Sequence, residues 1–195
     1  MGHANPVGGA QLLINDIQAV SRTPVNIRFR SRQEVIVYYS QMSRIGFRSL
    51  QLGVGTGRKY AIKIGISSLQ VKSIALAIFM EASISFESMQ SNWMFNKIST
   101  SGFSVEDLVS DLIGFYIAVY PGEDVIAQCD PVSKEEALTI WDAYGPVGNN
   151  KNYDFNPMFF PDPRIQCGKP IHGRLPFFLE RIRPAIEGDD YRRIE

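Results

Sequence analysis

Carboxylates are the side chains of this sequence best suited to chemistry. Glu81 interrupts an apolar stretch with helical character, and Glu87 follows six residues later. Burying a carboxylate in apolar surroundings costs free energy unless it is hydrogen-bonded or paired. Such surroundings can raise its pKa, which is how proteins make acid catalysts. Asp107 and Asp111 lie four residues apart, on one face of a second predicted helix. We therefore consider Glu81, Glu87, Asp107 and Asp111 as candidate catalytic residues.

Glycan hydrolysis is the reaction class that such residues suggest, because it needs two carboxylates at a defined separation. Six residues turn a helix by about 600°, so Glu81 and Glu87 point about 120° apart and form no pair by themselves. Asp107 or Asp111 would have to supply the second carboxylate. The structural interpretation is that Glu81 is buried and held by Arg28, Arg30 or Arg32 of the basic first third. In the same interpretation, the two aspartates form a solvated helix face.

Thiol and metal chemistry have less support. The histidines are His3 and His172, and the cysteines are Cys129 and Cys167. A zinc site would need most of these four residues, and no typical ligand spacing occurs, so we predict no metal and no cofactor. Either cysteine could act with His172 as a nucleophile, but two ordinary half-buried thiols are the simpler interpretation. Whether the two cysteines pair stays open.

The formal net charge of zero conceals an uneven distribution. The 195 residues carry 20 Lys and Arg against 20 Asp and Glu. Divided by segment, the charge is +7 over residues 1–65, −8 over residues 66–145 and +1 over residues 146–195. Because the first two values nearly cancel, we favour internal neutralisation of the basic segment by the acidic one.

Residues 24–32 alternate between apolar and basic side chains, which predicts a strand with one arginine face. Its members are Arg28, Arg30 and Arg32. If the acidic segment does not neutralise these arginines, they are a candidate site for an anion or a nucleic acid. A chain without surplus positive charge is poorly suited to neutralising phosphates, so a protein partner is favoured over nucleic acid.

Composition predicts a soluble protein, and the pattern of predicted helices and strands indicates the α+β class. Apolar residues make up 45% and charged residues 21%, values typical of a globular domain. We predict a mobile N-terminal arm over residues 1–24 and one globular domain over residues 25–195. No secretory signal is visible, which favours the cytoplasm or a signal-independent export route. The longest apolar run, Ile74–Met80, is far short of the roughly 20 residues of a membrane span. The oligomeric state is not predicted.

The predicted fold is mainly helical, with a small antiparallel sheet. A long helix from Ser68 to about Phe95 is apolar on almost every side, as expected of a buried central helix. Capping-box patterns predict that further helices begin after Ser104 and after Ser133. The remaining predicted elements are a strand over 24–32, a helix over 33–45, a β-hairpin over 48–64, helix ends at Tyr120 and Gly145, and a short helix near 177–182.

Glycines at alternate positions, Gly53, Gly55 and Gly57, lie inside the predicted hairpin. A phosphate-binding loop is excluded, because it should follow a strand, open a helix and end in Lys-Ser or Lys-Thr. Here a strand follows, so we assign the glycines to the hairpin turn. From Pro146 onward, seven of the eleven prolines interleave with aromatic residues. This pattern predicts an extended segment that packs on the rest of the protein.

Two segments carry a family resemblance. Residues 101–114 have the sequence Ser-Gly-Phe-Ser-Val-Glu-Asp-Leu-Val-Ser-Asp-Leu-Ile-Gly, and residues 80–87 have the sequence Met-Glu-Ala-Ser-Ile-Ser-Phe-Glu. They resemble an uncharacterised bacterial family of envelope-associated and lipoprotein-like chains, over roughly a quarter of this sequence. The family's histidine falls on Phe86 and its asparagine on Asp111, and residues 60–66 lack its Asp and His. The resemblance implies a shared scaffold more than a shared activity.

Taken together, these patterns favour a non-catalytic interaction or structural module. The first alternative is a glycan- or cell-wall-directed hydrolase with Glu81 or Glu87 as general acid or base. The second is anion or nucleic-acid binding by the strand of residues 24–32. The sequence does not decide whether the protein is an enzyme.

Overall fold

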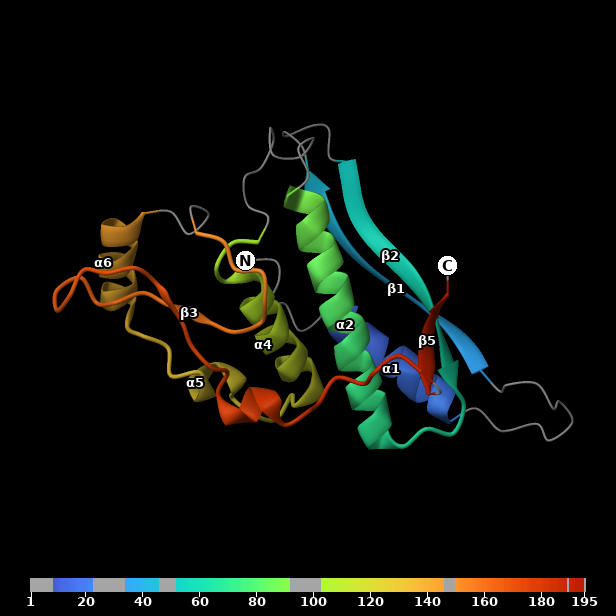
Figure 1. Ribbon diagram of the computed structural model, residues 1–195. Helices are drawn as coiled ribbons and strands as arrows, with labels where there is room; N and C mark the ends of the chain where they lie inside the picture. The colour runs from blue at the N-terminus through green and yellow to red at the C-terminus, as the bar shows by residue number, and fades with distance from the viewer. Residues whose placement is uncertain are drawn as a thin grey trace, which may run out of the picture. The chain divides into compact units, whose positions relative to one another are not determined.

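The computed structural model describes residues 9–22, 34–45, 52–91, 103–145, 150–188 and 190–194. Helices and antiparallel sheets occur together, so the α+β class is confirmed (Figure 1). The chain groups into two compact units. The sheet unit comprises Asn5–Phe86 and Ile182–Glu195, and the helical unit comprises Glu87–Arg181 with Met1–Ala4. The number of independently folding domains stays a prediction.

A three-stranded antiparallel sheet is the centre of the sheet unit. The strands are β1 (Glu34–Ile45), β2 (Leu52–Lys63) and β5 (Tyr191–Ile194), in the order β1-β2-β5. The long strand β2 pairs with β1 along its whole length and with β5 only over its last residues. The central strand therefore keeps a neighbour on one side throughout and on the other side for a short stretch.

The helix predicted over residues 33–45 is wrong, since Glu34–Ile45 form β1. Val37 and Tyr39 are buried, whereas Ile36 and Tyr38 are exposed, which is the two-residue period of a strand. The segment is rich in β-branched and aromatic residues, which pack well on a pleated surface. Pairing with β2 therefore outweighs the helical spacing of its apolar residues.

The hairpin predicted over residues 48–64 is wrong, because residues 52–63 form one continuous strand, β2. This strand pairs with β1, and the residues between the two strands lie outside the described part of the chain. Gly55 and Gly57, assigned to a turn from the sequence, lie inside β2. The predicted strand over residues 24–32 also lies outside the described residues. The third strand of the described sheet is β5.

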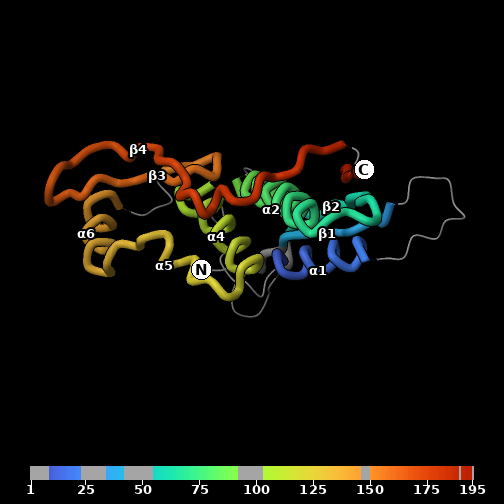
Figure 2. The backbone as a smooth tube through the Cα atoms, turned by 90° about the horizontal axis from the view of Figure 1, so that it is seen from below, coloured from blue at the N-terminus to red at the C-terminus, as the bar shows by residue number. Residues whose placement is uncertain are grey.

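Two helices of the sheet unit pack beside the sheet (Figures 1 and 2). Helix α1 (Gly9–Ser21) occupies most of the segment interpreted as an arm, and Leu13 and Ile17 on its inner face are buried. Helix α2 (Ser68–Ser91) is the long helix predicted from residue 68 onward. By length and composition alone it could cross a membrane, but half of its apolar window is buried, as in a core helix.

The core of the helical unit surrounds one apolar helix, α4 (Asp107–Val119). Leu108, Leu112, Phe115 and Tyr116 of this helix are buried, and the chain turns away from it at Pro121. The 3-10 helix Phe177–Glu180, at the place where a short helix was predicted near 177–182, contributes the buried Leu179. The elements of this unit are α4 (Asp107–Val119), α5 (Val125–Gln128), α6 (Lys134–Tyr144), β3 (Met158–Phe159), β4 (Ile171–His172) and η2 (Phe177–Glu180).

The two predicted capping boxes have different outcomes. The box at Ser133 is confirmed, because its hydroxyl accepts from the Glu136 amide and the Glu136 carboxylate accepts from the Ser133 amide. Ser104 is not the N-cap of α4, which is Glu106, although the Asp107 carboxylate does accept from the Ser104 amide at 2.9 Å. The chain makes an isolated bridge at Ser104, and this bridge displaces the helix start by two residues.

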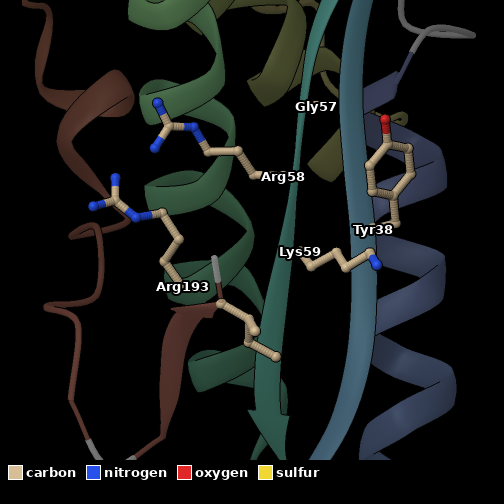
Figure 3. A pocket seen from close by; sticks show the side chains of 6 residues that line it. Tyr38, Gly57, Arg58, Lys59 and Arg193 are labelled. Carbon is tan, nitrogen blue, oxygen red and sulfur yellow. The ribbon is translucent and has the colours of Figure 1, made fainter.

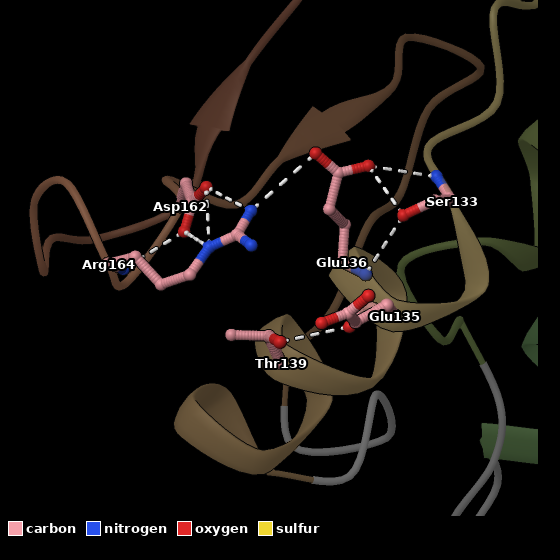
Figure 4. A network of polar contacts seen from close by, with 6 residues as sticks. All are labelled: Ser133, Glu135, Glu136, Thr139, Asp162 and Arg164. Carbon is pink, nitrogen blue, oxygen red and sulfur yellow. Dashed lines mark hydrogen bonds and ion pairs between the residues drawn. The ribbon is translucent and has the colours of Figure 1, made fainter.

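An extended polar network surrounds the confirmed cap (Figure 4). The Glu136 carboxylate lies 3.5 Å from Arg164 of the proline-rich segment, and Arg164 also binds Asp162 at 2.7 Å. The hydrogen bond from the Ser133 hydroxyl lowers the pKa of Glu136, and the Arg164 side chain lowers the pKa of Asp162. The network joins the start of α6 to the segment after β3, so the proline-rich part of the chain is tied to this helix.

Candidate functional site

The two faces of the three-stranded sheet differ in character. Tyr60 donates to Glu81 of α2, and the ring of Tyr39 lies 6.3 Å from that of Phe79 of α2. Helix α1 lies on the same side, since a Cβ atom at Gly9 would be 2.7 Å from the Tyr39 hydroxyl. We call this the helix face. The opposite, open face carries exposed side chains such as Tyr38, and neighbouring residues of a strand alternate between the two faces.

A surface pocket of about 440 Å³ lies where β5 ends beside β2. Arg58 and Arg193 extend to the same side, whereas Lys59 extends toward Tyr38 of β1 (Figure 3). Strand alternation places Arg58 and Arg193 on the helix face and Lys59 on the open face, so the pocket surrounds an edge of the sheet. Its lining residues are Tyr38, Gly57, Arg58, Lys59, Arg193 and Ile194.

Glu81 positions two of these cations. One of its carboxylate oxygens lies 3.1 Å from Arg58 and 3.0 Å from Arg193, and the other accepts from the Tyr60 hydroxyl at 3.2 Å. The side chains of Arg58 and Arg193 remain 40% and 48% exposed. The hydrogen bond to Glu81 raises the pKa of Arg193. Two guanidinium groups therefore share one carboxylate, and the exposed Lys59 on the open face adds a third cation to the pocket.

The buried Tyr60 hydroxyl belongs to the same cluster. Burial and the neighbouring Glu81 carboxylate raise its pKa well above the ordinary tyrosine value, because both disfavour a phenolate there. In the unfolded chain the same hydroxyl loses its proton near pH 10. Its stabilising contribution is therefore complete below about pH 10 and is lost as the pH rises toward the folded pKa.

We expect Tyr60→Phe to lower the free energy of unfolding by about 1 kcal/mol at pH 7, because one hydrogen bond to a carboxylate is lost. The difference between the variant and the parent protein should shrink as the pH rises above about 10. Urea unfolding at a series of pH values measures this, with Tyr38→Phe on the open face as the matched control. A difference that grows with pH would contradict the assignment.

The prediction for Glu81 is corrected in two respects. The carboxylate is paired with arginine, as the structural interpretation expected, but its partners are Arg58 and Arg193. Its side chain is also 32% exposed and not fully buried. The arginines first considered, Arg28, Arg30 and Arg32, lie outside the described residues, and their anion-binding role stays a prediction.

The other three candidate carboxylates lie in the helical unit. Glu87 is completely buried and accepts from the backbone N–H of Phe103 at 2.8 Å. Phe103 has a positive φ of 56°, so the carboxylate supports an unusual backbone conformation. Asp107 and Asp111 are buried as well, and the solvated helix face expected for them is wrong. Hydrolysis by these residues stays a hypothesis.

The cysteines have the environment of ordinary thiols. Both are free, so they form no disulfide with each other. Cys129 lies at the C-terminal cap of α5, and its thiol donates to the carbonyl of Val125. Burial raises the pKa of the Cys129 thiol, which is the opposite of what a thiolate nucleophile needs. In the described segments, no three His, Cys, Asp or Glu residues are grouped as a metal site would require.

Sequence reasoning missed Arg58, Lys59 and Arg193 as site residues. Arg58 and Lys59 were assigned to a hairpin strand, and Arg193 is 133 positions from its neighbour Tyr60 in the sheet. The excess of basic residues over residues 1–65 could have pointed to this site, because Arg58 and Lys59 contribute to it. The pairing of β2 with the C-terminal strand had no sequence signal of its own.

Comparisons with known proteins returned no similarity: no protein-family model matches the chain, and neither do the curated proteins or the solved structures. The likeness of residues 80–87 and 101–114 to an envelope-associated bacterial family therefore stays a prediction.

Proposed function

We propose that this chain is a non-catalytic interaction module that binds an acidic segment of a partner protein in the pocket beside β2. The observation that carries the proposal is the grouping of Arg58, Lys59 and Arg193 around one open pocket. Guanidinium and ammonium groups are the natural partners of carboxylates, and partly exposed cations can exchange solvent for such a partner.

A binding role fits the state of Glu81, the carboxylate that joins Arg58 and Arg193. Glu81 is held by two guanidinium groups and a tyrosine hydroxyl, which fixes the arginines in place. A carboxylate engaged in this way orients the positive groups and is poorly placed to exchange a proton with a substrate. Its role is therefore to position the arginines that contact the ligand.

A protein partner fits the surroundings of the pocket better than nucleic acid does. Tyr38 lines the pocket, and Ile36, two residues earlier on the open face of β1, is 62% exposed. Aromatic and arginine residues together are typical of protein–protein interfaces. The three cations of the pocket form one compact group, whereas nucleic-acid sites spread their cations along the phosphate backbone.

The test measures binding of a fluorescein-labelled peptide with four consecutive glutamates by fluorescence anisotropy. We expect saturable binding at about 50 mM salt that weakens as salt rises, because partly exposed charges are screened. Lys59→Gln should weaken binding by up to about fivefold, since each exposed charge pair contributes up to about 1 kcal/mol. The double variant R58Q/R193Q should weaken it further.

Lys63→Gln is the matched control, because Lys63 lies on the same strand and the same face as Lys59 but does not line the pocket. Circular dichroism verifies that each variant is folded. Absence of peptide binding, or equal losses in Lys59→Gln and Lys63→Gln, would contradict the proposal. A single-stranded oligonucleotide that binds more tightly than the peptide would replace the protein partner by nucleic acid.

A further inference from the structure

Building on the proposed function, we infer that the acidic segment binds as an additional β-strand along the edge of β2 that β5 leaves uncovered. The basic pocket and this edge occupy the same place in the sheet unit. A strand docked there would receive main-chain hydrogen bonds from β2 and charge contacts from the pocket.

The hydrogen bonds between β2 and β5 identify which backbone groups point toward this edge. The N–H of Lys63 donates to the carbonyl of Asp190 at 2.9 Å. In an antiparallel sheet, alternate residues of a strand direct both backbone groups to the same neighbour. Lys59 therefore faces β5, as Lys63 does, and Gly57 and Gly55 point their N–H and C=O groups to the same side.

Strand β5 ends before it reaches these glycines. Its last residue, Ile194, lies opposite Lys59, and in the described chain no strand pairs with β2 on that side from Leu52 to Arg58. By contrast, the outer edge of β5 is protected, because the N–H of Arg193 donates to the Glu187 carboxylate at 2.7 Å. The edge of β2 is therefore the place where a further strand can pair.

The glycines make this edge accessible. Gly55 and Gly57 are both exposed, and glycine in a strand often marks a place where another backbone approaches closely. The side chain of Tyr38 lies over Gly57, where a Cβ atom would meet its hydroxyl. The exposed ring of Tyr38 thus forms one wall beside the edge, on the open face.

Charge specifies the composition of the incoming strand. Its side chains would alternate between the two faces of the sheet. On the helix face they would meet Arg58 and Arg193, and on the open face they would meet Lys59. Both faces present cations, so the favoured ligand is a run of consecutive acidic residues and not an alternating apolar and acidic one.

Amide hydrogen exchange of the full-length protein, followed by NMR, tests the inference with the tetraglutamate peptide as ligand. Saturating peptide should slow exchange of the Gly55 and Gly57 amides at least tenfold, because they become hydrogen-bonded. Inorganic phosphate, which can fill the pocket but cannot pair as a strand, should leave the Gly55 amide unprotected. The amide of Tyr60, which faces β1, is the internal reference.

The outcomes separate the two proposals. Peptide binding that depends on Lys59 without protection of Gly55 and Gly57 overturns strand addition and leaves the anionic pocket intact. Protection of both glycines by the peptide supports strand addition. Absence of peptide binding overturns the proposed function, and strand addition with it.

A pair of variants at one position provides a second measurement. Gly57→Pro removes the N–H that points to the uncovered edge and removes no hydrogen bond to β1. It should weaken peptide binding at least tenfold. Gly57→Ala retains the N–H and adds a Cβ atom that would meet the Tyr38 hydroxyl and lie 3.0 Å from the Ser40 Cβ. The proline variant carries the same added atom, so the lost N–H separates the two variants, and Gly57→Ala should weaken binding less than threefold. Equal losses in the two variants would argue against main-chain pairing.

Discussion

The variant Glu87→Ala is expected to lose about 2–3 kcal/mol of unfolding free energy. Its carboxylate is fully buried and accepts the Phe103 amide at 2.8 Å, so truncation leaves that amide without this acceptor. A buried donor that loses its partner costs about 1–3 kcal/mol, and the lost side-chain volume adds to this. Urea denaturation followed by circular dichroism measures the effect. Such a loss is a large fraction of the stability of a typical domain.

Glu87→Gln separates the hydrogen bond from the charge. Glutamine keeps a carbonyl oxygen that can accept from the Phe103 amide, so it should lose less than half as much stability as alanine. If the glutamine and alanine variants are equally destabilised, the negative charge and not the acceptor is what the site needs. A glycan-hydrolysing activity that disappears in a fully folded Glu87→Gln protein would instead favour the hydrolase alternative.

Phe115→Ala should lower the free energy of unfolding by about 3–5 kcal/mol. Phe115 lies in α4 with no exposed surface, and its ring is 6.0 Å from that of Tyr116. Removing the ring loses the free energy gained by transferring it from water to the protein interior. It also leaves a cavity that the surrounding side chains refill only in part. Chemical denaturation measures the change, and a fluorescence probe of the helical unit reports whether the loss is local.

Phe177→Ala is the matched control, since Phe177 belongs to the same unit and is 82% exposed. Its replacement should change the unfolding free energy by at most about 0.5 kcal/mol. Comparable losses at positions 115 and 177 would mean that the exposed ring packs on something in solution. The placement of the helical core at α4 would then need revision.

Local sequence signals predicted two of the helices well, α2 and α6. The apolar residues from Ile74 to Met80 predicted a buried helix, and α2 is that helix. The hydroxyl of Ser133 and the carboxylate of Glu136 predicted the start of α6, because a capping box involves residues only three apart. Gly145, with a φ of 78°, ends α6 as predicted.

The sheet was harder to predict because its pairing is not local. Residues 34–45 have apolar side chains at both helical and strand spacings, and contact with β2 decides between them. The glycines of β2 suggested a turn, whereas their extended conformation depends on the partner strand. The basic pocket needs Arg193 beside Tyr60, and only the folded sheet brings these residues together.

The uncovered edge of β2 also bears on how copies of this protein behave toward one another. An exposed strand edge is a common route to aggregation, because a second copy can pair with it. Two copies that met at this edge would bring their Arg58, Lys59 and Arg193 side chains together, and like charges at close range repel. This repulsion opposes self-pairing at low ionic strength and weakens as salt screens the charges.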